Sequence, residues 1–362
     1  MTASKPRALL LWHSLTGYSA AGIRALAERA EVTVLARPPD PLAPYDYSAL
    51  DLGGVQVQVA DYPWSFALLD ELIARTRPDV ICVAGSGPAL WRALHRARRR
   101  YDSVTVMTTD YNWTGRPRQR VLQMLFAPLR RAVFDVAWVP GARSREYVRR
   151  LGFPKDVILS GVFTLDAAHF TEVAAGSAAR WSEPSFLFVG RLVPEKATDI
   201  LAEAYRVYRA NTADPWPLLV VGQGPFDGGL GGTPGVTMHG FVQPDALPEL
   251  YAAAGALVLP SREDLWGVVA LEACTAGLPV VVSDGCGVSE DLATPANGFT
   301  VPVGDTAALA AALTALAGAS PDQRREWGAT SSEMARSYGP DGWADTLLSA
   351  IRRMSRSRDG GT

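Results

Sequence analysis

The sequence predicts an α/β protein made of two doubly wound domains that face each other across a cleft. Short apolar runs alternate with helical stretches of about 10–15 residues, which is typical of βαβ units and a parallel sheet. This pattern restarts near residue 185, after a less regular stretch. The length of 362 residues also fits two domains of roughly 150 residues better than one.

In the first half, strands are expected at runs rich in apolar and β-branched residues: Ala8–Trp12, Val32–Ala36, Gly54–Ala60, Val80–Ala84, Ser103–Thr108 and Val136–Val139. Helices are expected where apolar residues recur every three to four positions: Ala20–Ala30, Trp64–Arg75, Pro88–Arg99 and Arg118–Ala132. These elements make residues 1–165 the first domain. The stretch 166–184 shows little regular pattern, and we interpret it as a linker.

In the second half, the expected strands are Phe186–Val189, Leu218–Val221, Val236–Met238, Ala256–Leu259 and Val280–Ser283. The expected helices are Lys196–Arg209, Val268–Ala276, Ala307–Ala317 and Gln323–Ser337. Residues 185–338 thus form the second domain, and a last helix near Gly342–Met354 follows the break at Gly339–Pro340. Two doubly wound units place a ligand at the carboxyl ends of their strands.

The composition excludes several classes of protein. With 48% hydrophobic and 20% charged residues and a mean hydropathy of +0.05, the chain is neither disordered nor a coiled coil. No apolar run approaches the ~18–20 residues of a membrane span. Ala8–Trp12 is too short for the apolar core of a signal peptide. Three cysteines, Cys82, Cys274 and Cys286, make no disulfide framework, so we expect a cytoplasmic protein.

The charge is unevenly distributed along the chain. Residues 1–165 carry 22 Lys and Arg against 14 Asp and Glu, whereas the remainder carries 13 against 23. An anionic ligand, a membrane surface, attraction between the halves, or simply solvated arginine-rich helices all account for this asymmetry. We expect no nucleic-acid partner, since no recognised binding module accompanies the basic residues.

One basic segment has an apolar face. Apolar residues between 121 and 129 are flanked by five arginines: Arg116, Arg118, Arg120, Arg130 and Arg131. A helix of this kind can lie on an anionic membrane. An ordinary packed helix, interrupted by Pro128, explains the pattern as well, so we expect at most a weak membrane contact through the basic first domain.

The most specific motifs follow two strands of the second half. Gly190 ends one strand, and the cations Arg191 and Lys196 come directly after it. Both cations can reach one diphosphate, the arginine as a fork and the lysine as a point charge.

About 70 residues further on, Glu263 and Asp264 follow the expected strand Ala256–Leu259. Gly267 then opens a helix whose free amides can receive a phosphate. Glu272 lies one turn inside that helix, where it can accept hydrogen bonds from a ribose diol.

These residues resemble the family-4 retaining glycosyltransferases, which have the GT-B fold of two Rossmann-like domains. The family signature is G-R-L-x-x-x-K, followed by E-x-F-G-L-x-x-x-E-A-x-A-x-G-x-P-V. The chain has Gly190-Arg191-Leu192 with Lys196, then Asp264-Leu265-Trp266-Gly267, Glu272-Ala273 and Ala276-Gly277-Leu278-Pro279-Val280. Further similarities occur at Val221–Pro225, His239–Val242, Glu290, Asn297-Gly298 and Gly304-Asp305.

The resemblance implies a role for each matched residue. Arg191 and Lys196 would neutralise the diphosphate of the donor, and Glu272 would hold its ribose. The base would meet the main chain of Gly240, Phe241 and Val242, and the distal phosphate the amides of Gly267, Val268 and Val269. Asp264 stands where the family has its first Glu, which contacts the transferred sugar; either Asp264 or Glu263 can take that role. The resemblance also implies that residues 339–362 cross back to the first domain.

The first half matches the family less well. The loop after the first strand has only Gly17 where the family often has two glycines near the sugar and phosphate, and His13 precedes it. Thr109 occupies the position of a sugar-binding histidine in many members. Asp110 and Asn112 are then the polar candidates for sugar contacts, although an Asx turn explains them equally well.

We expect no bound metal and no cofactor other than the sugar nucleotide, which is a co-substrate. The sequence has no Asp-x-Asp after a strand and no His/Cys pair at ligand spacing. The resemblance implies a hexosyltransferase that uses a UDP-, GDP- or dTDP-sugar. The acceptor is expected to be sugar-containing or small and polar: a natural product, or a lipid or polysaccharide precursor. High Ala and Arg usage indicates a bacterial source with GC-rich DNA. A sugar-nucleotide epimerase or hydrolase, or a catalytically silent partner protein of the same fold, remain alternatives.

Overall fold

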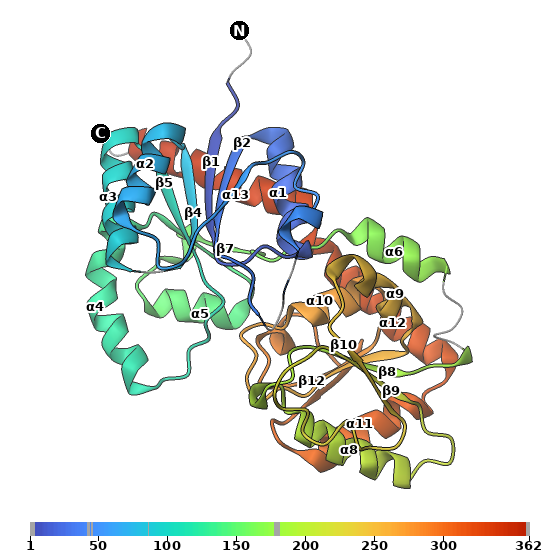
Figure 1. Ribbon diagram of the computed structural model, residues 1–362. Coiled ribbons are helices and arrows are strands. Elements are labelled where there is room, and N and C mark those ends of the chain that lie inside the picture. Colours follow the sequence, from blue (N-terminus) through green and yellow to red (C-terminus); the bar gives the residue numbers. More distant parts are fainter. Residues whose placement is uncertain (1–3, 42–43, 45, 86, 177–181, 360–362) are drawn as a thin grey trace. The chain divides into compact units, whose positions relative to one another are not determined.

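The chain forms two compact units in a computed structural model that describes residues 4–41, 44, 46–85, 87–176 and 182–359 (Figure 1). Unit 1 comprises Met1–Asp40, Tyr45–Thr164 and Tyr338–Thr362, and unit 2 comprises Pro41–Pro44 and Leu165–Ser337. Each unit contains one parallel β-sheet, as the alternation of strands and helices predicted.

The sheet of unit 1 has seven strands in the order β3-β2-β1-β4-β5-β6-β7. Their bounds are β1 (Arg7–Trp12), β2 (Glu31–Ala36), β3 (Val57–Val59), β4 (Val80–Ala84), β5 (Val104–Thr108), β6 (Val136–Val139) and β7 (Ile158–Ser160). The helices are α1 (Gly17–Arg29), α2 (Phe66–Thr76), α3 (Pro88–Tyr101), α4 (Pro117–Val133), α5 (Ala142–Arg150) and α13 (Pro340–Asp359). The strand order reverses direction at β1, which makes the sheet doubly wound.

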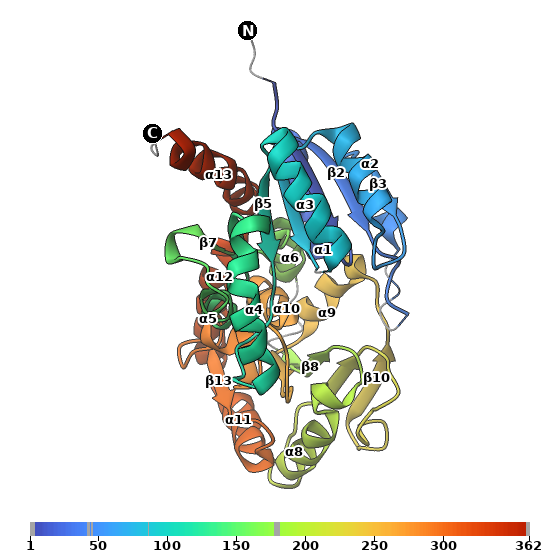
Figure 2. The ribbon, with the colours of Figure 1, turned by 90° about the vertical axis from the view of Figure 1, so that its left-hand side faces the viewer.

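The central strand β1 shows why both faces of this sheet are covered. Leu10 and Trp12 pack into a core with α1 and α13, whereas Leu9 and Leu11 pack into a second core with α2 and α3. Successive side chains of a strand point to opposite faces, so a continuous apolar run requires helices on both sides. Figure 2 shows α13 on the opposite side of the sheet from α2 and α3.

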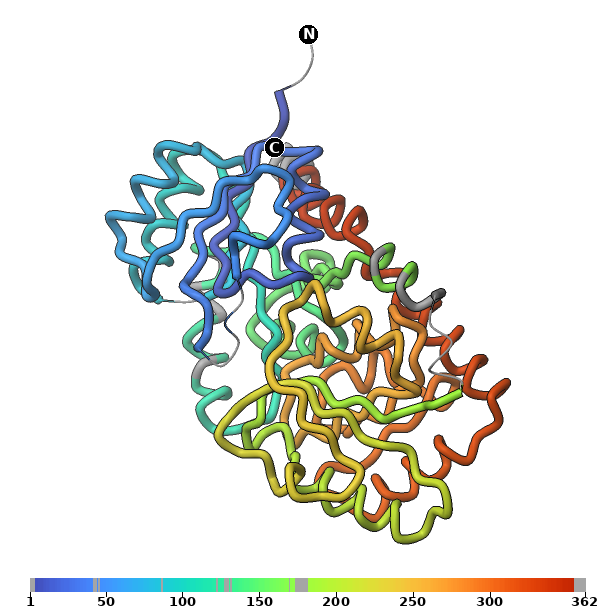
Figure 3. The backbone as a smooth tube through the Cα atoms, turned by 45° about the vertical axis from the view of Figure 1, so that its right-hand side comes forward, coloured from blue at the N-terminus to red at the C-terminus, as the bar shows by residue number. Residues whose placement is uncertain are grey.

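The last helix, α13, packs against unit 1, and its red trace runs beside the first half of the chain in Figure 3. Trp343 is 3% exposed, and its ring lies 4.8 Å from that of Trp138 and 6.3 Å from that of Trp12. The indole nitrogen of Trp343 donates a 2.7 Å hydrogen bond to the carbonyl of Val162. A side chain from the end of the sequence thus completes the core built by the first strands.

The sheet of unit 2 has six strands in the order β10-β9-β8-β11-β12-β13. Their bounds are β8 (Phe186–Val189), β9 (Leu218–Val221), β10 (Val236–Gly240), β11 (Ala256–Leu259), β12 (Val280–Ser283) and β13 (Gly298–Val301). The helices are α6 (Ala167–Gly176), α8 (Thr198–Ala210), α9 (Leu247–Ala253), α10 (Val268–Thr275), α11 (Thr306–Gly318) and α12 (Pro321–Ala335). The order reverses at β8, so β8 and β11 flank the switch point where α/β sheets bind ligands.

Several elements differ from the sequence expectations. The segment 166–184, expected to be an irregular linker, contains α6, which packs on α9 in unit 2. Helices α5 and α9 and the edge strands β7 and β13 were not predicted from the sequence. Helices α5 and α6 lack a strong apolar stripe, since α5 buries only Ser144 and Val148 and α6 is built largely from small residues.

We predict that Trp343→Ala destabilises unit 1 by about 3–5 kcal/mol, because it leaves a cavity between two tryptophans and removes a buried hydrogen bond. Urea unfolding followed by tryptophan fluorescence and circular dichroism measures the change. Arg352→Ala, an exposed change on the same helix, serves as the control and should have almost no effect. Equal stability of Trp343→Ala and the unsubstituted protein would show that α13 contributes little to this core.

Candidate functional site

Three loops are held together at the carboxyl edge of the unit 2 sheet. The amide of Gly190 donates to the carbonyl of Val221 (2.9 Å), and the amide of Gly222 donates to that of Gly240 (2.7 Å). Gly222 has φ +135°, and a Cβ there would lie 1.9 Å from the carbonyl oxygen of Gly190. Only glycine fits this approach, so the ends of β8, β9 and β10 meet at a defined place.

Lys196 and Asp264 form an ion pair beside this edge. The Lys196 Nζ lies 2.5 Å from Asp264 Oδ2, and the two side chains are only 16% and 13% exposed. The backbone supports the pair, because the amides of Arg262 and Glu263 both donate to the carbonyl of Glu195, at 2.8 and 3.3 Å. The structure therefore brings together two residues that the sequence placed 68 positions apart.

Arg262 is a positioning residue that the sequence analysis missed. Its guanidinium donates to both carboxylate oxygens of Asp199, at 2.8 and 2.6 Å, and also to the carbonyl of Pro194 at 2.8 Å. These hydrogen bonds lower the pKa of Asp199 and raise that of Arg262. The bidentate Arg262–Asp199 pair thus holds together the two segments that carry Lys196 and Asp264. The sequence did not predict this pair, because Asp199 and Arg262 are far apart along the chain.

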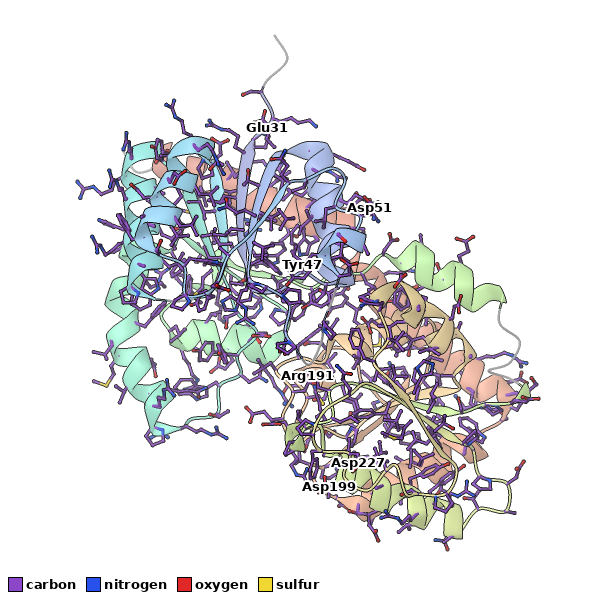
Figure 4. All side chains as sticks on the ribbon, viewed as in Figure 1. Glu31, Tyr47, Asp51, Arg191, Asp199 and Asp227 are labelled. Atoms are coloured by element: carbon purple, nitrogen blue, oxygen red, sulfur yellow. The ribbon has the colours of Figure 1, made fainter. Side chains whose placement is uncertain are left out.

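Arg191 follows Gly190 at the end of β8, and its side chain is exposed on unit 2 (Figure 4). On the neighbouring side, Gly240 has φ +82°, and the place where a Cβ would lie has nothing within 4 Å. Phe241 and Val242 continue from Gly240 as partly exposed residues without regular structure. Both residues therefore keep some exposed surface beside the end of β10.

Helix α10 begins at this edge. Gly267 precedes it with φ +105°, a conformation that favours glycine, and Ala270 makes the first hydrogen bond, 2.9 Å to the carbonyl of Gly267. The amides of Val268 and Val269 lie in the first turn, where helical amides have no acceptor within the helix. Trp266 fixes the entry to the helix through a 2.8 Å hydrogen bond to Asp291. The geometry suits an anion.

Glu272 lies one turn inside α10 and is held by Tyr251 of α9, whose hydroxyl donates a 2.6 Å hydrogen bond to Oε2. Burial raises the pKa of the Glu272 carboxyl to about 7, and the Tyr251 hydrogen bond opposes this shift. Tyr251 is itself fully buried. It was missed by sequence reasoning, because one tyrosine in a short apolar helix carries no distinguishing signal.

Glu263 and two other motif positions have different surroundings. The side chain of Glu263 is exposed. Asn297 is fully buried and donates to the carbonyl of Leu292 at 2.9 Å, while Asp305 caps α11 by accepting from the amide of Ala308 at 2.8 Å. Asn297 and Asp305 therefore stabilise the fold of unit 2.

In unit 1, His13 and Gly17 lie in the loop between β1 and α1. His13 packs against Tyr62 with a ring distance of 4.8 Å, and its Nε2 is buried without a hydrogen-bond partner among the described residues. Burial and then the charge of Arg37 lower the pKa of His13, so its imidazole is neutral at pH 7. Gly17 is the first residue of α1 and is partly exposed.

Thr109, Asp110 and Asn112 follow β5, and all three are partly exposed. The amide of Tyr111 donates to the Thr109 hydroxyl at 3.3 Å, and Ser144 donates to the Asp110 carbonyl at 2.9 Å. Because β1 and β5 are parallel and both pair with β4, this loop and the His13 loop lie at the same edge of the unit 1 sheet.

One of the three cysteines lies beside the candidate site, because Cys286 pairs with Asp264 through an isolated parallel bridge. Cys82, Cys274 and Cys286 are buried free thiols, which confirms that they form no disulfide. In the ranges that the structure describes, no three His, Cys, Asp or Glu side chains are grouped as metal ligands. None of the helices within those ranges has the length and apolar character needed to cross a membrane.

Two family models match the chain. The model for "Glycosyl transferases group 1" matches residues 183–318, and the model for "Glycosyltransferase Family 4" matches residues 22–164. The first match covers the unit 2 site and the second covers most of the unit 1 sheet.

Relatives and solved structures agree with these matches. D-inositol 3-phosphate glycosyltransferase of Gordonia bronchialis is 33% identical in an alignment of 196 positions that covers 49% of this chain and 42% of that protein. The chain thus spans less than half the length of this relative. A glycosyltransferase structure from Rickettsia africae aligns with TM-score 0.76 and 13% identity over 98% of this chain and 100% of that one. Anabaena HepE in complex with UDP-glucose aligns with TM-score 0.72 and 18% identity over 97% and 99%.

Two parallel-sheet Rossmann-like domains, together with the solved structures that align with them, define a protein of the GT-B fold class. The two family models together extend over most of its length. The chain belongs to glycosyltransferase family 4.

We predict that Glu272 makes stability depend on pH. In the folded protein the Glu272 carboxyl has a pKa of about 7, whereas the ordinary pKa of a glutamate is 4.5. The unfolded chain therefore binds fewer protons, and the free energy of unfolding falls as pH rises from about 4.5 to 7, by at most about 3 kcal/mol. Glu272→Gln should remove this fall, as measured by urea unfolding at pH 5, 6, 7 and 8.

Glu249→Gln is the matched control, because Glu249 is exposed on the neighbouring helix α9. It should follow the pH profile of the unsubstituted protein. The assignment to Glu272 is wrong if Glu272→Gln differs from that protein by the same amount at pH 5 and pH 8.

Proposed function

We propose that this chain is a retaining, metal-independent glycosyltransferase that moves a sugar from a nucleoside diphosphate donor to a hydroxyl or amine of an acceptor. The observation that carries the proposal is the Lys196–Asp264 pair at 2.5 Å, located beside the start of α10. A cation, a carboxylate and free helical amides on one sheet edge fit the charges of a sugar diphosphate.

The cations stabilise the leaving group. When the bond between the sugar and the diphosphate breaks, negative charge builds on the phosphate oxygens. Arg191 and Lys196 follow the same strand, and the amides of Val268 and Val269 supply further donors. Because these groups are already oriented by the fold, they favour the transition state with little reorganisation.

Asp264 is our choice for the carboxylate that contacts the sugar. In the structure it neutralises Lys196 within a largely buried pair, whereas the Glu263 side chain is exposed. A bound diphosphate would compete for the Lys196 ammonium and free Asp264 to accept hydrogen bonds from sugar hydroxyls. The same side chain thus keeps Lys196 in place before the donor binds and orients the sugar afterwards.

Glu272 is our candidate for the ribose contact. It stands behind the phosphate-binding amides on α10, and Tyr251 fixes one of its oxygens by a 2.6 Å hydrogen bond. The other oxygen can accept from the ribose hydroxyls. Gly240, Phe241 and Val242 offer main-chain groups to the base, and the complex of HepE with UDP-glucose makes UDP-sugars the first donors to test.

The configuration is retained if the acceptor attacks the anomeric carbon from the same face from which the leaving group departs. The bond from the anomeric carbon to the phosphate oxygen breaks, and a bond to the acceptor oxygen or nitrogen forms on the same face. The departing phosphate oxygen takes the proton of the acceptor, so this scheme needs no protein side chain as a strong base. The cations that face the phosphate keep it a good leaving group throughout.

We predict that one nucleoside diphosphate among UDP, GDP and dTDP stabilises the protein, and that it does so equally with EDTA and with magnesium. At about 100 times its dissociation constant, the nucleotide should raise the free energy of unfolding by about 2.7 kcal/mol. A thermal-shift series measures this effect. Lys196→Ala should lose most of it, because the diphosphate then lacks its point charge.

Arg206→Ala is the control, since Arg206 is an exposed arginine of unit 2 that pairs with Glu203 at 3.1 Å on the surface of α8. It should bind nucleotide normally. The donor site is misassigned if no nucleotide stabilises the protein, or if Lys196→Ala responds as strongly as the unsubstituted chain.

We also predict that Arg191→Ala and Lys196→Ala each lower kcat by about 10²-fold or more, since each removes a donor from the leaving group. A sugar-transfer assay with UDP-sugars and a panel of polyol and sugar acceptors measures turnover. Proton NMR of the first product should show the anomeric configuration of the donor. An inverted product would disprove retention, and sugar release at the same rate without acceptor would identify a hydrolase.

A further inference from the structure

Helix α4 exposes a row of large apolar side chains. Val121 is 56% exposed, Met124 79% and Leu125 65%, and Met124 is the most exposed of the large apolar side chains in the described chain. Their spacing of three and four residues places them on one face of the helix. Figures 1 and 2 show α4 at the border of unit 1, beside α3.

The other face of α4 fixes the orientation of this row. Phe126 and Val133 are buried, and the ring of Phe126 lies 5.9 Å from that of Trp91 and 6.4 Å from that of Phe134. The guanidinium of Arg130 lies 4.6 Å from the ring centre of Phe153. Because these contacts bind the helix to its own unit, the row formed by Val121, Met124 and Leu125 remains directed outward.

Several positively charged side chains lie next to the exposed apolar row of α4. Arg116, Arg118 and Arg120, at the start of α4, are all exposed. The sequence has no Asp or Glu between Asp110 and Asp135, so no acidic residue of this segment offsets the arginines. Unit 1 also contains the half of the chain with the excess of Lys and Arg.

We propose that this α4 face, formed by Arg116, Arg118, Arg120, Val121, Met124 and Leu125, docks unit 1 on an anionic phospholipid surface. The three apolar side chains would enter the boundary between head groups and acyl chains, and the arginines would contact the lipid phosphates. Because the apolar side chains project from one side of the helix, α4 would lie along the surface with its length of 17 residues, about 25 Å. This inference does not depend on the proposed transfer reaction.

An anionic lipid surface satisfies both parts of the face. A nucleic acid would attract the arginines but would leave Met124 and Leu125 exposed to water. A neutral lipid surface would accept the apolar side chains but would give the arginines nothing to neutralise. Since lipid attraction depends on both terms, binding should require anionic head groups and should weaken with salt.

The test is sedimentation of the full-length protein with vesicles. We expect binding to vesicles of phosphatidylcholine and phosphatidylglycerol at 7:3, little binding to pure phosphatidylcholine, and release by 0.5 M NaCl. Met124→Glu/Leu125→Glu should weaken binding at least about ten-fold, because both charges would have to enter the lipid boundary. Arg116→Gln/Arg118→Gln/Arg120→Gln should weaken it about five-fold for each arginine.

Two control variants match these changes. Val207→Glu/Val303→Glu places two charges on exposed apolar residues of unit 2, and Arg75→Gln/Arg99→Gln/Arg100→Gln removes three exposed arginines elsewhere in unit 1. Both should bind vesicles within about two-fold of the unsubstituted protein if location rather than total charge decides. Circular dichroism melts of all variants verify folding, which exposed substitutions should leave nearly unchanged.

The proposal is overturned if the protein ignores anionic vesicles, binds neutral ones equally, or loses no affinity in either α4 variant. It is also overturned if the α4 variants and their controls lose binding equally, because the contact is then a general effect of charge. A protein that ignores vesicles but forms a dimer that Met124→Glu/Leu125→Glu dissociates would show that the α4 face contacts a second copy of the chain.

Discussion

The site in unit 2 depends on the close approach of two backbones, at Gly190 and Gly222. A Cβ at Gly222 would lie 1.9 Å from the Gly190 carbonyl oxygen, so the loops after β8 and β9 meet only because a side chain is missing. This contact sets the direction in which the chain leaves β8, and Arg191 and Lys196 follow within six residues. The fold therefore sets the backbone positions from which the two cations extend.

The Lys196–Asp264 ion pair also stabilises the loops of the candidate site in unit 2. Lys196 and Asp264 are largely removed from water, and a buried charge without a partner is costly. Each therefore supports the other, and the bidentate contact between Arg262 and Asp199 holds the loops from which they extend. If the proposed donor binds here, this arrangement would reduce the free energy needed to order Lys196 and Asp264 on binding.

The sequence predicted the inner strands well because their apolar runs are continuous: β4, β6, β8, β9, β11 and β12 have the expected bounds. Edge strands such as β7 and β13 were missed, since burial on one side gives a weaker pattern. Helices α5 and α6 were missed because α5 has few apolar residues and α6 has mostly small ones. Candidate site residues were chosen by their spacing, and the structure pairs two of them, Lys196 and Asp264. Tyr251 and Arg262 act through contacts with residues distant in sequence, and such contacts have no local signal.

The environment of Glu272 links its effect on stability to the ribose contact that we propose for it. Its carboxyl is held in a place that raises its pKa to about 7, so near neutrality the ionised form exists at a cost to the fold. A ribose diol that donates two hydrogen bonds would favour that ionised form. Binding would then release protons around pH 7, and the affinity for the nucleotide would rise with pH through this range. Because burial raises the pKa of Glu272 to about 7, a hydrogen-bond donor that binds the carboxylate would change its ionisation near neutral pH.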